Sequence, residues 1–231
     1  MITMGPIRLA AVTRPDGHHA DSVADQLPRV VLATRNAHKV PEIRSILADS
    51  GAAVDLVSLA EFPDVGDVVE TGLTFAENAL LKAHAAATAT GLPALADDSG
   101  LAVDAMNGMP GIFSGRWVGR HGDDDANLEL LLGQLGDVPD EHRGGAFVCV
   151  AALVVPGGEE LVEEGVVPGR IIRERRGSNG FGYDPIFVPD GDTRTTAEMS
   201  AAEKNAMSHR GVAFRALAKR IADESLPKGR S

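Results

Sequence analysis

The amino-acid sequence predicts an α/β fold built around a mixed β-sheet. In the first half of the chain, short apolar runs of strand length alternate with segments of helical periodicity. In the second half, two long apolar runs joined by Pro156-Gly157-Gly158 predict an antiparallel hairpin. Hydrophobic residues make up 44% of the 231 residues, so the chain can bury a sizeable core.

Residues 1–28 differ from the rest of the sequence. They contain proline, glycine, histidine and scattered aspartate without periodicity, and they lack the charged start and apolar centre of a signal peptide. We interpret them as a disordered or loosely attached extension, with a misassigned start codon as the alternative. A single catalytic domain is expected over residues 29–231.

The first predicted strand is Val30–Ala33, a short apolar run of the kind that is buried inside a sheet. A polar loop, Thr34–Lys39, separates this strand from a helix over Val40–Asp49, whose apolar residues recur on one face. Val54–Leu59 is predicted to form the next strand.

An Ala-rich helix is predicted to begin at a capping box formed by Thr74 and Glu77 and to end near Thr90. Two strands should follow on either side of a loop over Asp97–Gly100, namely Leu92–Ala96 and Leu101–Ala105.

A second capping box, Ser200 with Glu203, predicts the start of the last helix. The remaining elements are helices over Ala126–Leu135 and Ala201–Ala222 and strands over Phe147–Val155, Leu161–Val167 and Pro185–Val188.

The formal net charge of −11 argues against nonspecific binding to nucleic acid or to an anionic membrane, because such proteins carry a basic face. No apolar run approaches the ~20 residues that span a bilayer. The lone cysteine, Cys149, cannot form an internal disulfide, so a reducing compartment such as the cytoplasm is expected. Because Cys149 lies in an apolar run, we interpret it as a buried residue rather than a nucleophile.

The segment Asp97-Asp98-Ser99-Gly100 is the centre of the predicted chemistry. Loops at strand ends are where α/β proteins place ligands. Neighbouring carboxylates suit a hard cation such as Mg²⁺, and one of them could take a proton from water. An ordinary turn is the alternative, because Asp, Ser and Gly all form turns. Glu70 is a further carboxylate in a Gly-containing loop, and a solvated surface acid is its alternative.

Asn78 and Lys82 lie four residues apart on the Ala-rich helix and therefore share a face that could support a site. A polar connection before the first helix pairs hydroxyl, amide and ammonium groups, and consists of Thr34, Arg35, Asn36, Ala37, His38 and Lys39. Backbone N–H groups and a lysine at a helix start favour phosphate, although the P-loop pattern is absent. An ordinary polar connection is the alternative.

The loop Gly180-Phe181-Gly182-Tyr183-Asp184-Pro185 concentrates aromatic residues among glycines. A ring with free space beside it can stack on a base, and Asp184 could accept a hydrogen bond from the base edge. Further along the chain, Lys204, His209 and Arg210 could neutralise phosphate or donate to a keto oxygen. A structural turn and a structural histidine are the alternatives.

Together these segments resemble the inosine/xanthosine triphosphate pyrophosphatase family, which removes noncanonical purine nucleotides from the cell's pool. The resemblance runs from about Val30 to about Leu217. It depends on five ordered motifs: Ala33-Thr34-x-Asn36-x-x-Lys39, Glu70-Thr71-Gly72-Leu73-Thr74-Phe75-x-Glu77-Asn78-Ala79, Ala96-Asp97-Asp98-Ser99-Gly100-Leu101, Gly180-Phe181-Gly182-Tyr183-Asp184-Pro185-Ile186-Phe187 and Glu203-Lys204-x-x-x-Ser208-His209-Arg210-Gly211. Arg35 and His38 occupy variable positions of the first motif, where smaller residues are common.

The resemblance implies an elongated mixed sheet that forms two lobes around a central cleft, a homodimer and a Mg²⁺ cofactor. The implied reaction is hydrolysis of ITP, dITP and XTP to the monophosphate and pyrophosphate. Residues 34–39 would hold the phosphates, Glu70 and Asp98 would bind Mg²⁺, and Asp98 would also act as the base. Ser99 would touch the nucleotide. The base and its 6-keto group would be held by Phe181, Gly182, Tyr183, Asp184, Lys204, His209 and Arg210.

Supporting roles are expected for Glu77, Asn78 and Lys82, and Asp97 would either contact the metal or support its ligands. Two other functions fit parts of the sequence: a nucleotide-binding regulator without catalysis, and a pyrophosphatase for modified pyrimidine nucleotides. A pure binder needs no base, so the intact carboxylates argue against the first. The group Lys204, Ser208, His209 and Arg210 argues against the second.

Overall fold

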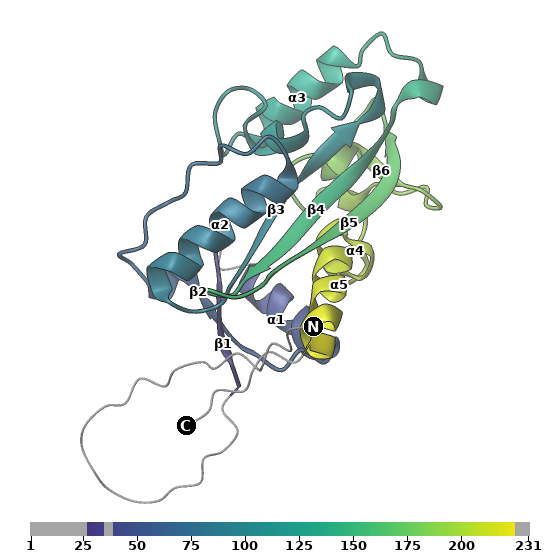
Figure 1. The fold of residues 1–231 in the computed structure, drawn as a ribbon. Helices are drawn as coiled ribbons and strands as arrows, with labels where there is room; N and C mark the ends of the chain where they lie inside the picture. Colours follow the sequence, from purple (N-terminus) through teal and green to yellow (C-terminus); the bar gives the residue numbers. More distant parts are fainter. Residues whose placement is uncertain (1–26, 35–38, 225–231) are drawn as a thin grey trace, which may run out of the picture.

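The computed structural model describes residues 27–34 and 39–224. One six-stranded sheet has the order β2-β1-β3-β4-β5-β6 (Figure 1). The parallel part comprises β1 (Arg29–Leu32), β2 (Asp55–Ser58) and β3 (Ala94–Val103). The antiparallel part continues through β4 (Gly144–Val154), β5 (Glu160–Ile171) and β6 (Phe187–Pro189). The predicted α/β class with a mixed sheet is confirmed.

The helices divide between the two faces of the sheet. Apolar residues of α1 (Lys39–Asp49) and α5 (His209–Glu224) form one core cluster with Leu95 of β3. On the other face, the alanines of α2 (Phe75–Thr90) pack against Ala96 of the same strand. Because successive side chains of a strand point to opposite faces, β3 contributes to both clusters.

A third core cluster lies at the far end of the long strands, where α3 (Asp124–Gln134) packs beside the aromatic side chains of Tyr183 and Phe187. Figure 1 shows β3, β4 and β5 running from the end covered by α1, α2 and α5 to the end covered by α3. The clusters therefore divide the molecule into two lobes, and the segment Asp97–Gly100 lies between them.

The prediction of a loop at Asp97–Gly100 is wrong, because this segment is the middle of β3. Each of its residues pairs with β4, from Asp97 with Ala151 to Gly100 with Val148. The long apolar strand β4 offers an unbroken antiparallel partner, and its ladder of hydrogen bonds overrides the turn preference of Asp, Ser and Gly. Strand alternation then sends the two aspartates to opposite faces of the sheet.

The prediction of a single helix over Ala201–Ala222 is also wrong, because α4 (Ala201–Met207) and α5 are separated at Ser208. Ser208 has an extended backbone with φ −63° and ψ 145°, and its Oγ accepts a hydrogen bond from the N–H of Gly211 at 2.9 Å. Ser208 thus caps α5 and ends α4. The capping box of Ser200 with Glu203 is confirmed at the start of α4.

The other predicted elements agree in type, with shifted ends. The predicted strand Pro185–Val188 begins as a 3-10 turn over Asp184–Ile186 before β6. Apart from residues 27 and 28, the predicted extension lies outside the described residues. Within the described chain, no helix combines the length and apolar character that crossing a membrane requires.

Gly165 of β5 allows the start of α5 to lie directly on the sheet. A β-carbon added at Gly165 would lie 2.1 Å from the carbonyl oxygen of His209 and 2.5 Å from the amide nitrogen of Ala213. Both atoms belong to the helix backbone and cannot rotate away. The missing side chain therefore sets the distance between β5 and the turn that carries His209 and Arg210.

Replacing Gly165 with alanine should lower the free energy of unfolding by about 1–3 kcal/mol, because α5 must shift to relieve the overlap. Chemical denaturation measures the change. Gly133→Ala is the matched control, since Gly133 lies within α3 and an added β-carbon meets nothing within 4 Å. That control should gain about 0.5–1 kcal/mol from helix propensity. An equal gain in Gly165→Ala would contradict the close contact.

Candidate active site

The candidate site lies where β3 continues beyond the end of β1. Leu32, the last residue of β1, pairs with Leu95, and the N–H of Ala33 donates to the carbonyl of Leu95 at 2.7 Å. Past this point no strand of the described chain pairs with that edge of β3, apart from an isolated bridge at Ala102. A ligand lying across this edge can therefore reach side chains on both faces of the strand.

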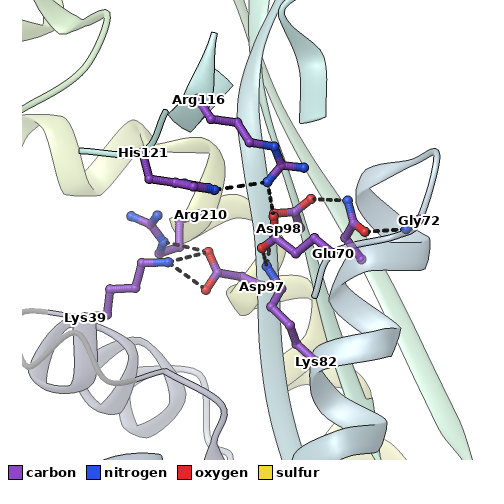
Figure 2. A network of polar contacts seen from close by, with 10 residues as sticks. Lys39, Glu70, Gly72, Lys82, Asp97, Asp98, Arg116, His121 and Arg210 are labelled. Atoms are coloured by element: carbon purple, nitrogen blue, oxygen red, sulfur yellow. Dashed lines mark hydrogen bonds and ion pairs between the residues drawn. The ribbon is translucent and has the colours of Figure 1, made fainter. Parts of the chain in front are cut away.

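Asp98 lies on the α2 face of this edge and shares a cation with Glu70. The ammonium of Lys82 lies 3.0 Å from Oδ1 of Asp98 and 3.0 Å from Oε1 of Glu70 (Figure 2). Nδ2 of Asn78 donates to Oδ2 of Asp98 at 3.2 Å. Asn78 and Lys82 lie one helical turn apart on α2 and share a face, as predicted. Both side chains on this face bond Asp98.

Opposing influences set the charge states of these carboxylates. Burial raises the pKa of Asp98 above its ordinary value, and the nearby Lys82 ammonium only partly offsets this effect. Burial also opposes ionisation of Glu70, but Lys82 and Arg116 outweigh it and lower the pKa of that carboxyl group. Asp98 is therefore the better proton acceptor of the two.

The loop that carries Glu70 is fastened to the first turn of α2. Oδ1 of Asn78 accepts a hydrogen bond from the N–H of Gly72 at 2.8 Å. The carboxylate of Glu77 accepts from the N–H of Leu73 at 2.5 Å, while Thr74 Oγ1 caps the N–H of Glu77 at 3.1 Å. Thr74 is the N-cap as predicted, but Glu77 bonds the loop rather than the N–H of Thr74. Asn78 links Asp98 to the Glu70 loop through its two amide atoms.

Asp97 lies on the opposite face and joins two other elements. Its oxygens lie 3.0 and 3.1 Å from Nζ of Lys39, at the start of α1, and Nε of Arg210 on α5 donates to Oδ2 at 3.3 Å. Burial alone would raise the pKa of Asp97, but Lys39 and Arg210 outweigh it and hold the pKa well below the ordinary value. Asp97 is therefore a buried anion neutralised by two cations, separate from the Glu70–Asp98 group.

The carboxylates of Glu70 and Asp98 fit a hard divalent cation. Both already converge on one positively charged atom, Nζ of Lys82, and both offer oxygen. Among the described residues there is no cluster of three or more His, Cys, Asp or Glu side chains that could enclose a metal. Two carboxylates without a full protein cage are typical of Mg²⁺, which commonly takes its other ligands from water and substrate phosphate.

An open pocket adjoins β3 on the side of His209. It brings together the predicted residues of the aromatic loop and the last helices with Ser99. Its lining residues are Ser99, Gly100, Leu101, Ser114, Gly115, Asp124, Phe147, Phe181, Gly182, Tyr183, Asp184, Lys204, His209 and Arg210.

Phe181 and His209 give the pocket two different aromatic surfaces. Phe181 is 64% exposed, and Nζ of Lys204 lies 4.8 Å from the centroid of its ring. The ring of His209 stacks on Phe147, with centroids 5.0 Å apart and planes at 13°. Burial, assisted by the charge of Arg210, lowers the pKa of His209 to about 3, so the imidazole is neutral at physiological pH. A neutral imidazole donates from one nitrogen and accepts at the other.

Asp184 bonds three neighbours around the aromatic loop. It is buried, and Thr196 Oγ1 donates to its Oδ1 at 2.7 Å. Its Oδ2 accepts from the N–H of Phe181 at 2.8 Å and also bonds Nζ of Lys204. Asp184 thus holds Phe181 and Lys204 in place, and a further bond to a base stays a prediction.

Arg116 and Asp124 contact residues of the site but were not predicted from the sequence. Arg116, on a 3-10 helix over Gly111–Arg116, donates from Nη1 to Oε2 of Glu70 at 2.9 Å. Asp124 accepts from the N–H of Gly182 at 3.0 Å. No helical or strand spacing relates these residues to the motifs, so only the fold reveals them. Of the predicted phosphate loop, Arg35, Asn36, Ala37 and His38 lie outside the described residues.

Cys149 is fully buried in β4, and burial raises the pKa of its thiol far above the ordinary value. This environment favours the interpretation of Cys149 as a packing residue, because the thiolate is the nucleophilic form.

Replacing Asp97 with asparagine should lower the free energy of unfolding at neutral pH by about 3 kcal/mol, because the buried Arg210 and the partly buried Lys39 lose their counter-charge. The folded-state pKa lies below the unfolded one, so the benefit is complete above the ordinary aspartate pKa of 3.8 and is lost as the pH falls below it. Denaturation at several pH values should therefore show a deficit that shrinks toward acid.

Asp140→Asn is the control, since Asp140 makes an ion pair with Arg173 at 2.6 Å but is 76% exposed. It should change stability by at most about 1 kcal/mol. A deficit for Asp97→Asn that is no larger than this, or that grows toward acid, would contradict the proposed ion pairing.

Known proteins share this fold and sequence pattern. The sequence profile of the Ham1 family matches residues 30–220. A dITP/XTP pyrophosphatase from Streptomyces coelicolor is 63% identical over 191 residues, which cover 83% of this chain and 96% of that protein. One from Frankia alni is 61% identical, over 82% of this chain and 95% of that protein.

Solved structures agree. A nucleoside-triphosphatase / dITP/XTP pyrophosphatase from Mycobacterium abscessus is 56% identical with a TM-score of 0.71, over 82% of this chain and 97% of that one. A HAM1 protein from Coxiella burnetii is 43% identical with a TM-score of 0.79, over 85% of this chain and all of that one. With matches across both lobes and the site between them, this chain belongs to the Ham1 family.

Proposed function

We propose that this protein is a nucleoside triphosphate pyrophosphatase that converts ITP, dITP and XTP to the monophosphate and pyrophosphate. The observation that carries the proposal is the meeting of two sites at the open edge of β3. A carboxylate and ammonium group, built from Glu70, Asp98 and Lys82, lies at this edge, and an aromatic pocket begins at the next residue of the strand, Ser99. The names of relatives up to 63% identical support the same reaction.

The chemistry of the α2 face suits hydrolysis between phosphates. Asp98 is positioned by Lys82 and Asn78, and its raised pKa favours removal of a proton from an attacking water. We assign Asp98 as the base and Glu70 with Asp98 as the ligands of Mg²⁺. When bound, the metal ion supplies positive charge that offsets the negative charge growing on phosphate oxygens.

The cations around β3 would hold the phosphates. Lys39 gives two of its interactions to Asp97, which fixes the ammonium at the start of α1, directly after residues 34–38. Lys82 bridges the two carboxylates and can turn toward a departing pyrophosphate. We propose that residues 34–39 bind the phosphate chain together with Lys82, and that Ser99 contacts the nucleotide.

The pocket suits a purine with a 6-keto group. A keto oxygen accepts hydrogen bonds, whereas the amino group of adenine donates them. Lys204, neutral His209 and Arg210 offer donors along one side of the pocket, and Phe181 offers an exposed ring for stacking. A donor left unpaired by adenine would penalise ATP, because a buried donor without a partner costs free energy.

We also propose that the enzyme is a homodimer, as the resemblance implies, and that it acts on small-molecule nucleotides in the cytoplasm and binds neither nucleic acid nor membrane. The net charge of −11 supports the last two points.

Asp98→Asn should reduce kcat for ITP by about 10²–10⁴-fold, because the amide cannot accept the proton. Steady-state release of pyrophosphate with saturating Mg²⁺ measures this. Asp223→Asn, an exposed change on α5, is the control and should retain wild-type turnover. Near-normal turnover by Asp98→Asn would refute the assignment of the base. Binding of ITP by the wild-type enzyme without turnover would favour the regulatory alternative.

ITP, dITP and XTP should be hydrolysed much faster than ATP or GTP, and equal rates for all five would refute the proposed specificity.

Because the pKa of His209 is about 3, its hydrogen-bond donor does not titrate near neutrality. The ratio of kcat/KM for ITP to that for ATP should therefore stay constant between about pH 5 and pH 8. A ratio that changes around pH 6.5 in the wild type, and not in His209→Gln, would contradict a neutral His209.

A further inference from the structure

In the described part of the chain, Glu70 pairs with Lys82 and with Arg116, and Arg116 belongs to the lobe that contains α3. Hydrogen bonds around Ser114 fix the position of Arg116. The N–H of Leu101 donates to Ser114 Oγ at 2.9 Å, and Tyr183 OH donates to the carbonyl of Ser114 at 3.0 Å. Gly100 permits this contact, since an added β-carbon would lie 2.5 Å from Ser114 Oγ. The same short helix then ends at Arg116, which is thereby fixed beside the open edge of β3.

The position of Arg116 completes the pairing of Glu70. Nη1 of Arg116 donates to Oε2 of Glu70 at 2.9 Å, while Lys82 takes Oε1 at 3.0 Å (Figure 2). The Arg116 and Glu70 side chains are each 23% exposed, so water screens this pair only partly. The guanidinium also lies 5.5 Å from the centroid of the Phe113 ring and 3.5 Å from Nε2 of His121.

The charges of this group disfavour a metal ion that enters without a nucleotide. Two carboxylates, Glu70 and Asp98, face two permanent cations, Lys82 and Arg116, so the group is already neutral. A divalent cation that entered alone would compete with both cations for the same oxygens and would be repelled by them. A nucleotide that arrives with the metal brings phosphate oxygens to which these two cations can transfer their hydrogen bonds.

We propose that Arg116 excludes the metal ion from the free enzyme by occupying Glu70, and releases Glu70 to the metal only when substrate phosphates accept the guanidinium. Arg116 is thus a positioning residue that couples metal entry to nucleotide entry. The inference rests on the proposed metal ligands, Glu70 and Asp98. It requires no change in protonation, because an arginine keeps its charge at all physiological pH values.

The test measures Mn²⁺ binding to the full-length protein without nucleotide. Bound Mn²⁺ is quantified by the loss of the free-ion signal in electron paramagnetic resonance. Arg116→Met should bind Mn²⁺ about tenfold more tightly than wild type, because a unit positive charge beside the proposed metal ligand Glu70 is removed. Its kcat/KM for ITP should fall, since a cation for the phosphates is lost. A general loss of structure would weaken both quantities together.

Two matched variants complete the comparison. Arg175→Met removes an arginine that is paired with Asp125 and Glu129 away from the site, and it should bind Mn²⁺ as wild type does. The double variant Glu70→Gln with Arg116→Met should lose the added affinity. Equal or weaker Mn²⁺ binding by Arg116→Met, or the same gain in Arg175→Met, would overturn the proposal.

A calorimetric titration of the wild type decides the matter even if Arg116→Met does not fold. We expect no saturation by Mg²⁺ alone at concentrations that support full turnover of ITP. Saturable binding in that range by the nucleotide-free enzyme would overturn the proposal. An absence of pyrophosphate release from ITP would instead count against the proposed function, while the Mn²⁺ comparison would still judge the role of Arg116.

Discussion

The continuation of β3 beyond β1 is the constraint on which the site depends. Pairing with β4 keeps the segment Asp97–Gly100 extended, while the end of β1 leaves its other edge open. Alternation along the strand then gives each aspartate its own face and its own partners. A turn at this place would have put both carboxylates into one cluster. The strand instead separates a buried structural anion from a carboxylate that is available for chemistry.

Two ion groups follow from this separation. Asp97 links the start of α1 to the start of α5, and so fixes Lys39 relative to Arg210. Asp98 links α2 to the Glu70 loop and, through Glu70, to Arg116 of the other lobe. Both groups lie between the core clusters, where polar side chains replace apolar packing. The pair between Glu70 and Arg116 joins the two lobes, and charged side chains of both groups are those we propose to act on the substrate.

The sequence was informative about elements and motifs, and less so about geometry. Apolar periodicity located most strands and helices, and capping residues located the starts of α2 and α4. Turn propensity failed at Asp97–Gly100, because a long-range ladder with β4 decided the conformation. Helical periodicity failed at Ser208, because the cap interrupts a pattern that reads as continuous. Arg116 could not be predicted, because its contact with Glu70 spans 46 residues of sequence and depends on how η3 (Gly111–Arg116) packs on β3.

The most direct test of this account is a crystal structure with Mn²⁺ and a non-hydrolysable inosine triphosphate analogue, in which anomalous scattering locates the metal. We expect a metal peak beside Glu70 and Asp98, the base against Phe181, and Asp97 still paired with Lys39 and Arg210. A metal peak on Asp97, or a metal bridging Asp97 and Asp98, would contradict the division of the two aspartates between the faces of β3.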